Sequence, residues 1–276
     1  MKIFLLWTFA LLITLASAYY QRVTGPTYPT DGKTSIDGAN VEYTLPRSHS
    51  GNTDEIIKIS VDDPSVKGIL EWKRYKTSDE WTRVDMNYKN GELSAVLPVQ
   101  PPSGKLQYRM TIIKDNNLIT VPDEEQLVIR FKGEVPLWIL IPHVIFIFGA
   151  MLLSTRTGLE VFKKEPKLKK FTLWTLGVLI IGGMIFGPLT QLYAFGELWT
   201  GVPFGYDLTD NKTLIALIGW LIAAWAVYKS SRPGFWVIFA AVLMLIIFLI
   251  PHSVLGSELD YNKLDQEKQN QTEVVE

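Results

Sequence analysis

The sequence predicts an α+β multidomain chain, in which an extracytoplasmic β-sandwich precedes a four-helix transmembrane bundle. Three observations predict it. Charged residues populate the first half of the 276 residues, short alternating segments fill roughly 34–132, and four long apolar segments follow between 136 and 250. This length suits about two domains at the usual ~100 to 200 residues each.

Composition excludes several classes of function. The formal net charge is -1, which gives no reason to expect a nucleic-acid partner. Cysteine is absent, so disulfides, thiolate metal sites and thiol nucleophiles are excluded together. We therefore expect the fold to be stabilised by packing alone.

Residues 1–18 read as a secretory signal peptide. A basic Lys2 precedes an apolar run from Ile3 to Leu15, and Ala16-Ser17-Ala18 offers a small-x-small cleavage site. The alternative is an uncleaved anchor helix. The apolar run would span only ~20 Å of a ~30 Å hydrocarbon core, which favours cleavage after Ala18.

Residues 19–33 contain closely spaced Gly and Pro residues and predict an extended arm. A β-sandwich domain is predicted over 34–132, beginning with a two-residue hairpin turn at Asp37-Gly38. In 105–114, apolar residues alternate with polar ones, which indicates one buried and one wet face. The expected strands lie near 34–36, 40–44, 55–61, 67–75, 81–87, 92–97, 105–114 and 125–131.

Two runs of this half, Asn90 to Pro98 and Pro101 to Tyr108, resemble the late strands of bacterial fibronectin type III and immunoglobulin-like domains. The resemblance covers less than a third of the β half and implies a fold, but no function. No named family resembles the apolar half. Trp72, Tyr75 and Trp81 either pack within the sandwich or line a carbohydrate-binding face.

The apolar half predicts four membrane spans, near 136–154, 171–189, 213–228 and 235–250. Basic residues cluster after the first span, at 163–170, and after the third, at 229–232. The positive-inside rule places both clusters in the cytoplasm. The sandwich and the polar tail, 255–276, are then extracytoplasmic, and we expect the chain in the bilayer of a bacterial inner (cytoplasmic) membrane.

An aromatic, Gly-rich and acidic loop, Gly187 to Thr213, separates the second and third spans. Its aromatic side chains should lie in the interface or fold back into the bundle. Asp207 or Thr209 can cap the third span, with Asp210 near its positive end. The loop is either only a capped interfacial segment or also the cover of a site.

Two copies of Leu-Ile-Pro-His place His143 and His252 at similar depth on the outer side. Such a pair can serve a haem b, a metal ion or a quinol. Alternatively, both histidines are interfacial residues near helix ends. Two histidines do not complete a metal site. The possible loop contributors are Glu197, Trp199, Tyr206, Asp207 and Asp210.

Two classes of function remain open. The first is a non-catalytic integral membrane subunit or scaffold of a cell-envelope complex, whose sandwich and aromatic loop dock a membrane or envelope protein partner. It is favoured because the chain lacks cysteine, a nucleophile motif and, by expectation, paired buried charges within its spans. The alternative is an electron-transfer or quinol-handling membrane protein that uses His143 and His252.

Overall fold

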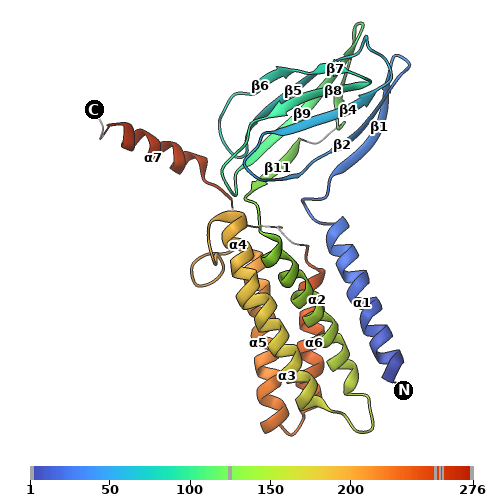
Figure 1. Ribbon diagram of the computed structural model, residues 1–276, viewed down its shortest axis with the longest axis vertical. Helices are drawn as coiled ribbons and strands as arrows, with labels where there is room; N and C mark the ends of the chain where they lie inside the picture. The colour runs from blue at the N-terminus through green and yellow to red at the C-terminus, as the bar shows by residue number, and fades with distance from the viewer. Residues whose placement is uncertain (1–2, 124–125, 252–253, 255, 257, 274–276) are drawn as a thin grey trace. The chain divides into compact units, whose positions relative to one another are not determined.

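The computed structural model describes residues 3–123, 126–251, 254, 256 and 258–273. They form two compact units (Figure 1). The helical unit comprises Met1–Pro26 and Val135–Ser257, and the β unit comprises Thr27–Glu134 and Glu258–Glu276. The first residues of the C-terminal tail contact the β unit, and Tyr261, at the start of helix α7 (Tyr261–Glu273), is buried there, so the tail is not wholly a free polar extension.

The β unit contains two sheets, with five and six strands. The first has the order β1-β2-β4-β8-β7, formed by Thr30–Ile36, Ala39–Leu45, Glu55–Val61, Glu92–Leu97 and Asn87–Lys89. The second has the order β3-β11-β9-β5-β6, formed by Ser48–Ser50, Leu127–Lys132, Lys105–Lys114, Lys67–Arg74 and Thr82–Asp85. Strand β10 (Asn117–Val121) pairs with β9.

One hydrophobic core joins the two sheets, as in a β-sandwich. Strand β9 supplies Leu106, Tyr108, Met110 and Ile112, all fully buried, so the predicted alternation is confirmed. The hairpin turn is confirmed as well, because Asp37 and Gly38 join β1 to β2 with φ angles of 45° and 79°. A fibronectin type III or immunoglobulin-like relationship stays a prediction.

The prediction of an extended arm over 19–33 is wrong for the first and the last residues of this range. Helix α1 (Ile3–Val23) continues to Val23, and β1 already begins at Thr30. Gly32, taken as a breaker, pairs with Tyr43 on β2, and a Cβ at this position would lie 2.2 Å from the Tyr43 ring. The glycine therefore makes room for an aromatic ring across the strand pair.

Helix α1 packs into the helical unit. Its buried residues recur every three or four positions, which forms one face, and this face contacts α2 and α6. At its end, Gln21 Nε2 donates a hydrogen bond of 2.6 Å to the carbonyl of Phe248. With 21 residues, α1 is ~32 Å long, so our length argument against an uncleaved anchor is wrong. Cleavage after Ala18 stays a prediction.

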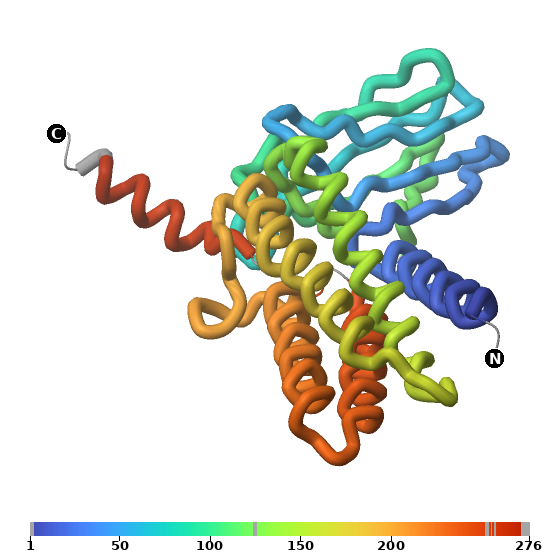
Figure 2. The backbone as a smooth tube through the Cα atoms, turned by 60° about the horizontal axis from the view of Figure 1, so that its bottom comes forward, coloured from blue at the N-terminus to red at the C-terminus, as the bar shows by residue number. Residues whose placement is uncertain are grey.

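Helices α2 to α6 form a closed four-membered bundle, in which α2 and α5 each contact both α3 and α6 (Figure 2). Their bounds are α2 Leu137–Glu160, α3 Leu168–Leu179, the π-helix η1 Ile180–Phe186, α4 Gly187–Phe195, α5 Leu208–Lys229 and α6 Pro233–Leu249. Helices α3, η1 and α4 follow one another without a break, so they are called the rod. The spans are thus longer than predicted, and the first nine residues of the predicted loop are helical.

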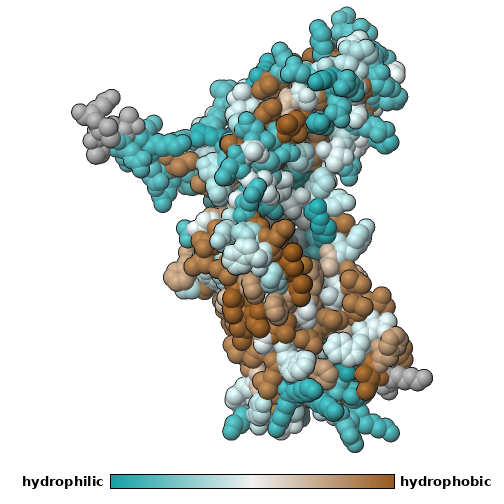
Figure 3. Space-filling view, in the orientation of Figure 1, coloured by the Kyte–Doolittle hydropathy of each residue, from teal (hydrophilic) through white to brown (hydrophobic). Residues whose placement is uncertain are grey.

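Four described helices are long and apolar enough to cross a membrane, namely α1, α2, the rod and α5. Helix α6 is apolar but shorter, at 17 residues. Apolar side chains cover the middle of the helical unit, while hydrophilic ones gather at the end that holds the α2–α3 and α5–α6 connections (Figure 3). Helices long and apolar enough to cross a membrane are therefore present, as expected, although the predicted span 235–250 corresponds to the shorter α6 and α1 was not among the four. That these helices cross a membrane stays a prediction.

Candidate functional site

His143 lies on α2 beside the π-helix. Its Nδ1 is 3.0 Å from the carbonyl oxygen of Gly182, and because a carbonyl only accepts, Nδ1 is the donor. In the neutral ring, Nε2 then carries the lone pair. A Cβ on Gly182 would lie 2.9 Å from the backbone of Phe146 and Ile147, so this glycine permits the close approach. Single turns of π-helix are frequent at functional sites.

His252 lies outside the described residues, so its proximity to His143 is untested. Haem b, metal and quinol binding at this pair stay predictions. Among the residues the structure describes, no group of three or more His, Asp or Glu side chains is arranged to hold a metal ion.

The ordered loop runs from Gly196 to Asp207. Gly196 ends α4 with a φ of 85°, a conformation that glycine adopts without strain. Asp207 is the N-cap of α5, as one of our two alternatives predicted, and it accepts a 2.7 Å hydrogen bond from the Thr209 amide. The backbone is thus fixed where the loop leaves one helix and enters the next.

Asp210 holds the middle of the loop. Its buried carboxylate accepts hydrogen bonds from the amides of Thr200 and Gly201, at 2.6 and 3.0 Å. Gln191 on α4 donates to the Thr200 hydroxyl at 2.7 Å. The next residue, Asn211, accepts from the Val202 amide at 2.8 Å. Asp210 and Asn211 bind loop backbone, and Gln191 binds a loop hydroxyl, so these side chains do not converge as a metal-ligand set.

The outer side of the loop is apolar and exposed. Phe204 and Tyr206 are 82% and 92% exposed, so they do not fold back into the bundle as one of our alternatives allowed. Leu198 and Val202 are also exposed; the four residues are called the loop patch. Of the other predicted contributors, Glu197 is exposed, and Trp199 Nε1 donates to the Val202 carbonyl at 3.1 Å.

A buried charge pair lies beyond the predicted first span, 136–154, but within helix α2, which extends to Glu160. Arg156 and Glu160 on α2 have side chains only 1% and 0% exposed, with Nη2 2.6 Å from Oε2. Lys163 Nζ lies 3.0 Å from Glu160 Oε1. The four-residue spacing of opposite charges on one helix could have revealed this pair in the sequence.

Aromatic rings enclose the guanidinium of Arg156. Its Cζ lies 4.7 Å from the ring centroid of Phe171 on α3 and 5.4 Å from that of Trp7 on α1. Such stacking favours a delocalised cation. The pair and its rings therefore join three helices at one end of the helical unit.

At the other end, Lys212 is buried and donates to the carbonyls of Ile250 and Pro251, at 2.9 and 3.4 Å. Gln21 binds the Phe248 carbonyl beside them. Helix C-termini leave carbonyls without intrahelical partners, and a cation there also interacts favourably with the helix dipole. Sequence reasoning named neither residue.

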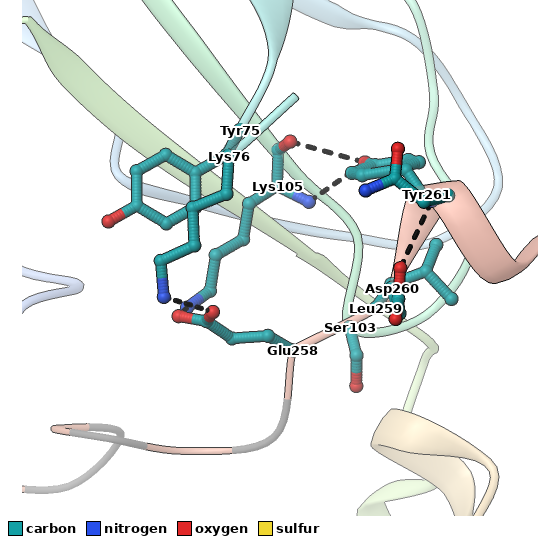
Figure 4. A pocket seen from close by; sticks show the side chains of 9 residues that line it. Tyr75, Lys76, Ser103, Lys105, Glu258, Leu259, Asp260 and Tyr261 are labelled. Carbon is teal, nitrogen blue, oxygen red and sulfur yellow. Dashed lines mark hydrogen bonds and ion pairs between the residues drawn. The ribbon is translucent and has the colours of Figure 1, made fainter. Parts of the chain in front are cut away.

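The β unit has a polar cavity of about 300 Å³ where the tail meets β5 and β9 (Figure 4). Its lining residues are Tyr75, Lys76, Ser103, Lys105, Glu258, Leu259, Asp260, Tyr261 and Asn262. No residue pattern marks this site in the sequence, because the tail reads as a solvated polar segment.

Comparisons with models of protein families and with curated proteins give no match to the chain. Its function is therefore argued from its own residues.

Proposed function

We propose that this protein is a non-catalytic integral membrane subunit of a cell-envelope complex, in which the loop patch and the β unit contact partner proteins. The observation that carries the proposal is the loop 196–207. Its backbone is fixed by Asp207, Asp210 and Asn211, while four apolar side chains remain exposed on it.

A fixed loop with exposed aromatic residues suits protein binding. Aromatic side chains on rigid supports supply most of the energy of many interfaces, because little conformational entropy is lost when the partner binds. The loop also leads into the start of α5. In the proposed topology this start lies at the membrane surface, where aromatic residues contact lipid headgroups. Insertion into a fluid lipid interface does not require a fixed backbone, whereas a complementary protein surface does.

The acidic residues of this region support a non-catalytic role. The carboxylates of Asp207 and Asp210 accept backbone hydrogen bonds that hold the loop. Glu160, at the far end, is paired with Arg156 and Lys163. Each of these buried or capping carboxylates therefore has a structural task.

The proposed topology puts the β unit and the loop outside the cytoplasm of a bacterial inner membrane. The basic residues of 163–170 and 229–232 support it, since such clusters are retained on the cytoplasmic side. The side chains that meet at Arg156 agree with it: Trp7 is near the start of α1 and Phe171 near the start of α3. An amino terminus in the cytoplasm would bring α1 across the membrane toward an extracytoplasmic β unit.

The test is the size of the complex in native membranes. Phe204→Ser combined with Tyr206→Ser removes the largest exposed part of the loop patch without touching its base. In mild detergent, we expect the wild type to migrate above its 31.3 kDa monomer mass on a native gel and the double variant to lose the larger species. Leu118→Ser, a change at an exposed apolar residue of β10, is the matched control.

A photo-crosslinking amino acid at position 204 distinguishes the two possible neighbours. A covalent protein adduct of defined mass supports the proposal. Adducts with lipid alone, or an unchanged complex in the double variant, would refute it.

The position of His143 supports a second candidate, electron transfer or quinol handling. Its ring is oriented by the Gly182 carbonyl, as histidine ligands are commonly oriented by a backbone acceptor. A haem b would give a Soret band in purified protein that His143→Ala weakens. A quinol site would show a loss of quinol binding in the same variant.

A further inference from the structure

The tail segment, residues 258–265, is seated on the β unit as a bound peptide would be. The Leu259 amide donates to the Ser103 carbonyl at 3.2 Å. Tyr261 is 4% exposed, and its hydroxyl accepts from the Lys105 amide at 3.0 Å. A Cβ on Gly104 would lie 2.9 Å from that hydroxyl, so the glycine leaves room for the tyrosine.

The charges of the tail segment are matched one by one. Glu258 lies between two lysines, with its oxygens 2.6 Å from Lys105 Nζ and 2.6 Å from Lys76 Nζ (Figure 4). One helical turn beyond Tyr261, Asp265 lies 2.8 Å from Arg74 Nη2. The Arg74 guanidinium also stacks on the Tyr261 ring, 5.0 Å from its centroid.

Contacts within the β unit also hold the binding surface. Asp79 accepts hydrogen bonds from Arg74 Nε and Nη2, at 2.6 and 3.0 Å, and Arg74 Nη1 donates to Asp265 of the tail. The ring of Tyr75 lies 5.3 Å from Lys76 Nζ and 5.6 Å from Lys105 Nζ. Two lysines on an aromatic ring and a fixed arginine form a site for two acidic groups with a tyrosine between them.

The pKa of the Glu258 carboxyl reports how well the site holds an anion. Burial raises this pKa, but hydrogen bonds from Lys105 and Lys76 outweigh burial and hold it below its usual value. Burial lowers the pKa of Lys105, which Glu258 partly offsets. The site therefore favours an ionised carboxylate at neutral pH.

The contacts are also weak enough to exchange. The Lys76 side chain is 63% exposed, and ion pairs at such positions contribute little individually. A cavity of about 300 Å³ remains beside the seated tail, so packing there is incomplete. Among the tail's first residues, Tyr261 supplies the deeply buried anchor.

We infer that the groove at the end of β5 and the start of β9 is a recognition site for an acidic segment of a partner protein, with the pattern Glu-x-x-Tyr-x-x-x-Asp, and that the tail occupies it as an intramolecular competitor. The inference rests on the proposed docking role of the β unit for its partner. It does not involve the loop patch.

Binding of a labelled synthetic peptide with the sequence of residues 258–268 to the full chain in detergent tests the site, by fluorescence anisotropy. Wild type should bind weakly, because its own tail occupies the groove. Glu258→Lys with Tyr261→Ala releases the tail but leaves Arg74, Lys76 and Lys105 intact. We expect at least ~10-fold tighter apparent binding to this variant, since affinity scales with the open fraction.

Matched controls separate recognition from general attraction. In the tail-released chain, Lys76→Glu with Lys105→Glu should abolish binding, while Lys67→Glu, at an exposed lysine at the far end of β5, should not. A peptide with the same Glu→Lys and Tyr→Ala changes should fail to bind. The single variant Glu258→Lys provides a milder release, should the double variant unfold.

Two outcomes overturn the inference. One is equal, weak binding of the peptide by wild type and by both folded tail-released variants. The other is association of tail-released chains with wild-type chains in light scattering, which would assign the groove to the tail of a second copy. Failure of the peptide assay leaves the loop-patch crosslinking result standing, so the two proposals fail separately.

Discussion

The two units treat the same chemical group differently. In the β unit, Glu71 lies 2.8 Å from Arg83 Nε and 2.8 Å from Arg109 Nε. In the helical unit, Glu160 is likewise paired with two cations, Arg156 and Lys163. Both carboxylates are buried, but the Arg83 side chain is 74% exposed, whereas that of Arg156 is 1% exposed and enclosed by aromatic rings.

The difference lies in whether water reaches the cations that pair with each buried carboxylate. Hydrogen bonds from Arg109 and Arg83 outweigh the burial of Glu71 and lower its pKa, while water still reaches Arg83. Arg156 has no such access, so its charge must be matched within the protein. Loss of one member of the buried ion-pair group should therefore lower the free energy of unfolding only modestly in the β unit, but strongly in the helical unit.

The largest difference is expected in how a membrane-impermeant thiol reagent labels cysteines introduced into the two units. In the cysteine-free chain, Lys89→Cys and Gln269→Cys in the β unit should be labelled in intact spheroplasts, and Lys167→Cys should be labelled only after lysis. All three positions are exposed in the structure, so protection reports the side of the membrane. The reverse pattern would contradict the proposed topology.

Removing the matched carboxylates compares the two environments directly. Glu160→Ala strands a buried arginine and should lower the free energy of unfolding by ~3 to 5 kcal/mol. Glu71→Ala leaves Arg83 and Arg109 in reach of water, so a loss of only about 1 kcal/mol is expected. Denaturant unfolding in detergent measures both.

The double variant Arg156→Ala with Glu160→Ala is the control for this comparison. It removes the stranded charge and should be more stable than Glu160→Ala alone. Equal losses for Glu160→Ala and Glu71→Ala would show that the two environments do not differ as we argue.

Two glycines of the rod offer a smaller contrast within one unit. A Cβ at Gly182 meets the backbone of Phe146 and Ile147 at 2.9 Å, whereas nothing lies within 4 Å of one at Gly177. Gly182→Ala should destabilise the unit by ~1 to 3 kcal/mol through overpacking. Gly177→Ala should stabilise it by up to about 1 kcal/mol, because alanine is the better helix former. Thermal unfolding of the two variants checks the signs.

The smallest expected effect is the acid release of the tail. The pKa values of Glu258 and Asp265 are held below their usual values, so their contribution is present at neutral pH and is lost as pH falls below about 4. A fluorophore on Gln269→Cys should show constant anisotropy from about pH 7 to 5 and a fall below about pH 4. An unchanged anisotropy in acid would contradict this role of the ion pairs.

Much of the β unit could be predicted because its signals are local. Alternation in β9 and the Asp37-Gly38 turn each depend on a few neighbouring residues. Strands β3, β7 and β10 were missed, because two have only three residues and β10 returns from a turn at Asp115. Of the three, β3 alone pairs with a strand distant in the sequence, β11, whereas β7 and β10 pair with their neighbours β8 and β9.

The candidate sites were predicted less well, for a related reason. Asp207 was found because a capping residue precedes its helix in the chain. The partner of His143, the Gly182 carbonyl, is a backbone atom that no residue pattern announces. Tail docking depends on Lys76 and Lys105. Nothing in the sequence distinguishes these lysines from others, because their role depends on Glu258, which is distant in the chain.

If a signal peptidase acts on the chain, as the sequence predicts, cleavage after Ala18 competes with the docking that places Trp7 against Arg156. A peptidase that cuts after Ala18 would release one wall of the guanidinium's enclosure, whereas prompt docking of α1 onto α2 would withdraw the scissile bond from the enzyme. Two mature forms are then possible, and the intact mass of the purified protein identifies which one prevails. Trp7→Ala slows docking in this scheme and should shift the population toward the shorter form, so the fate of the first helix would be decided by kinetics rather than by its cleavage motif alone.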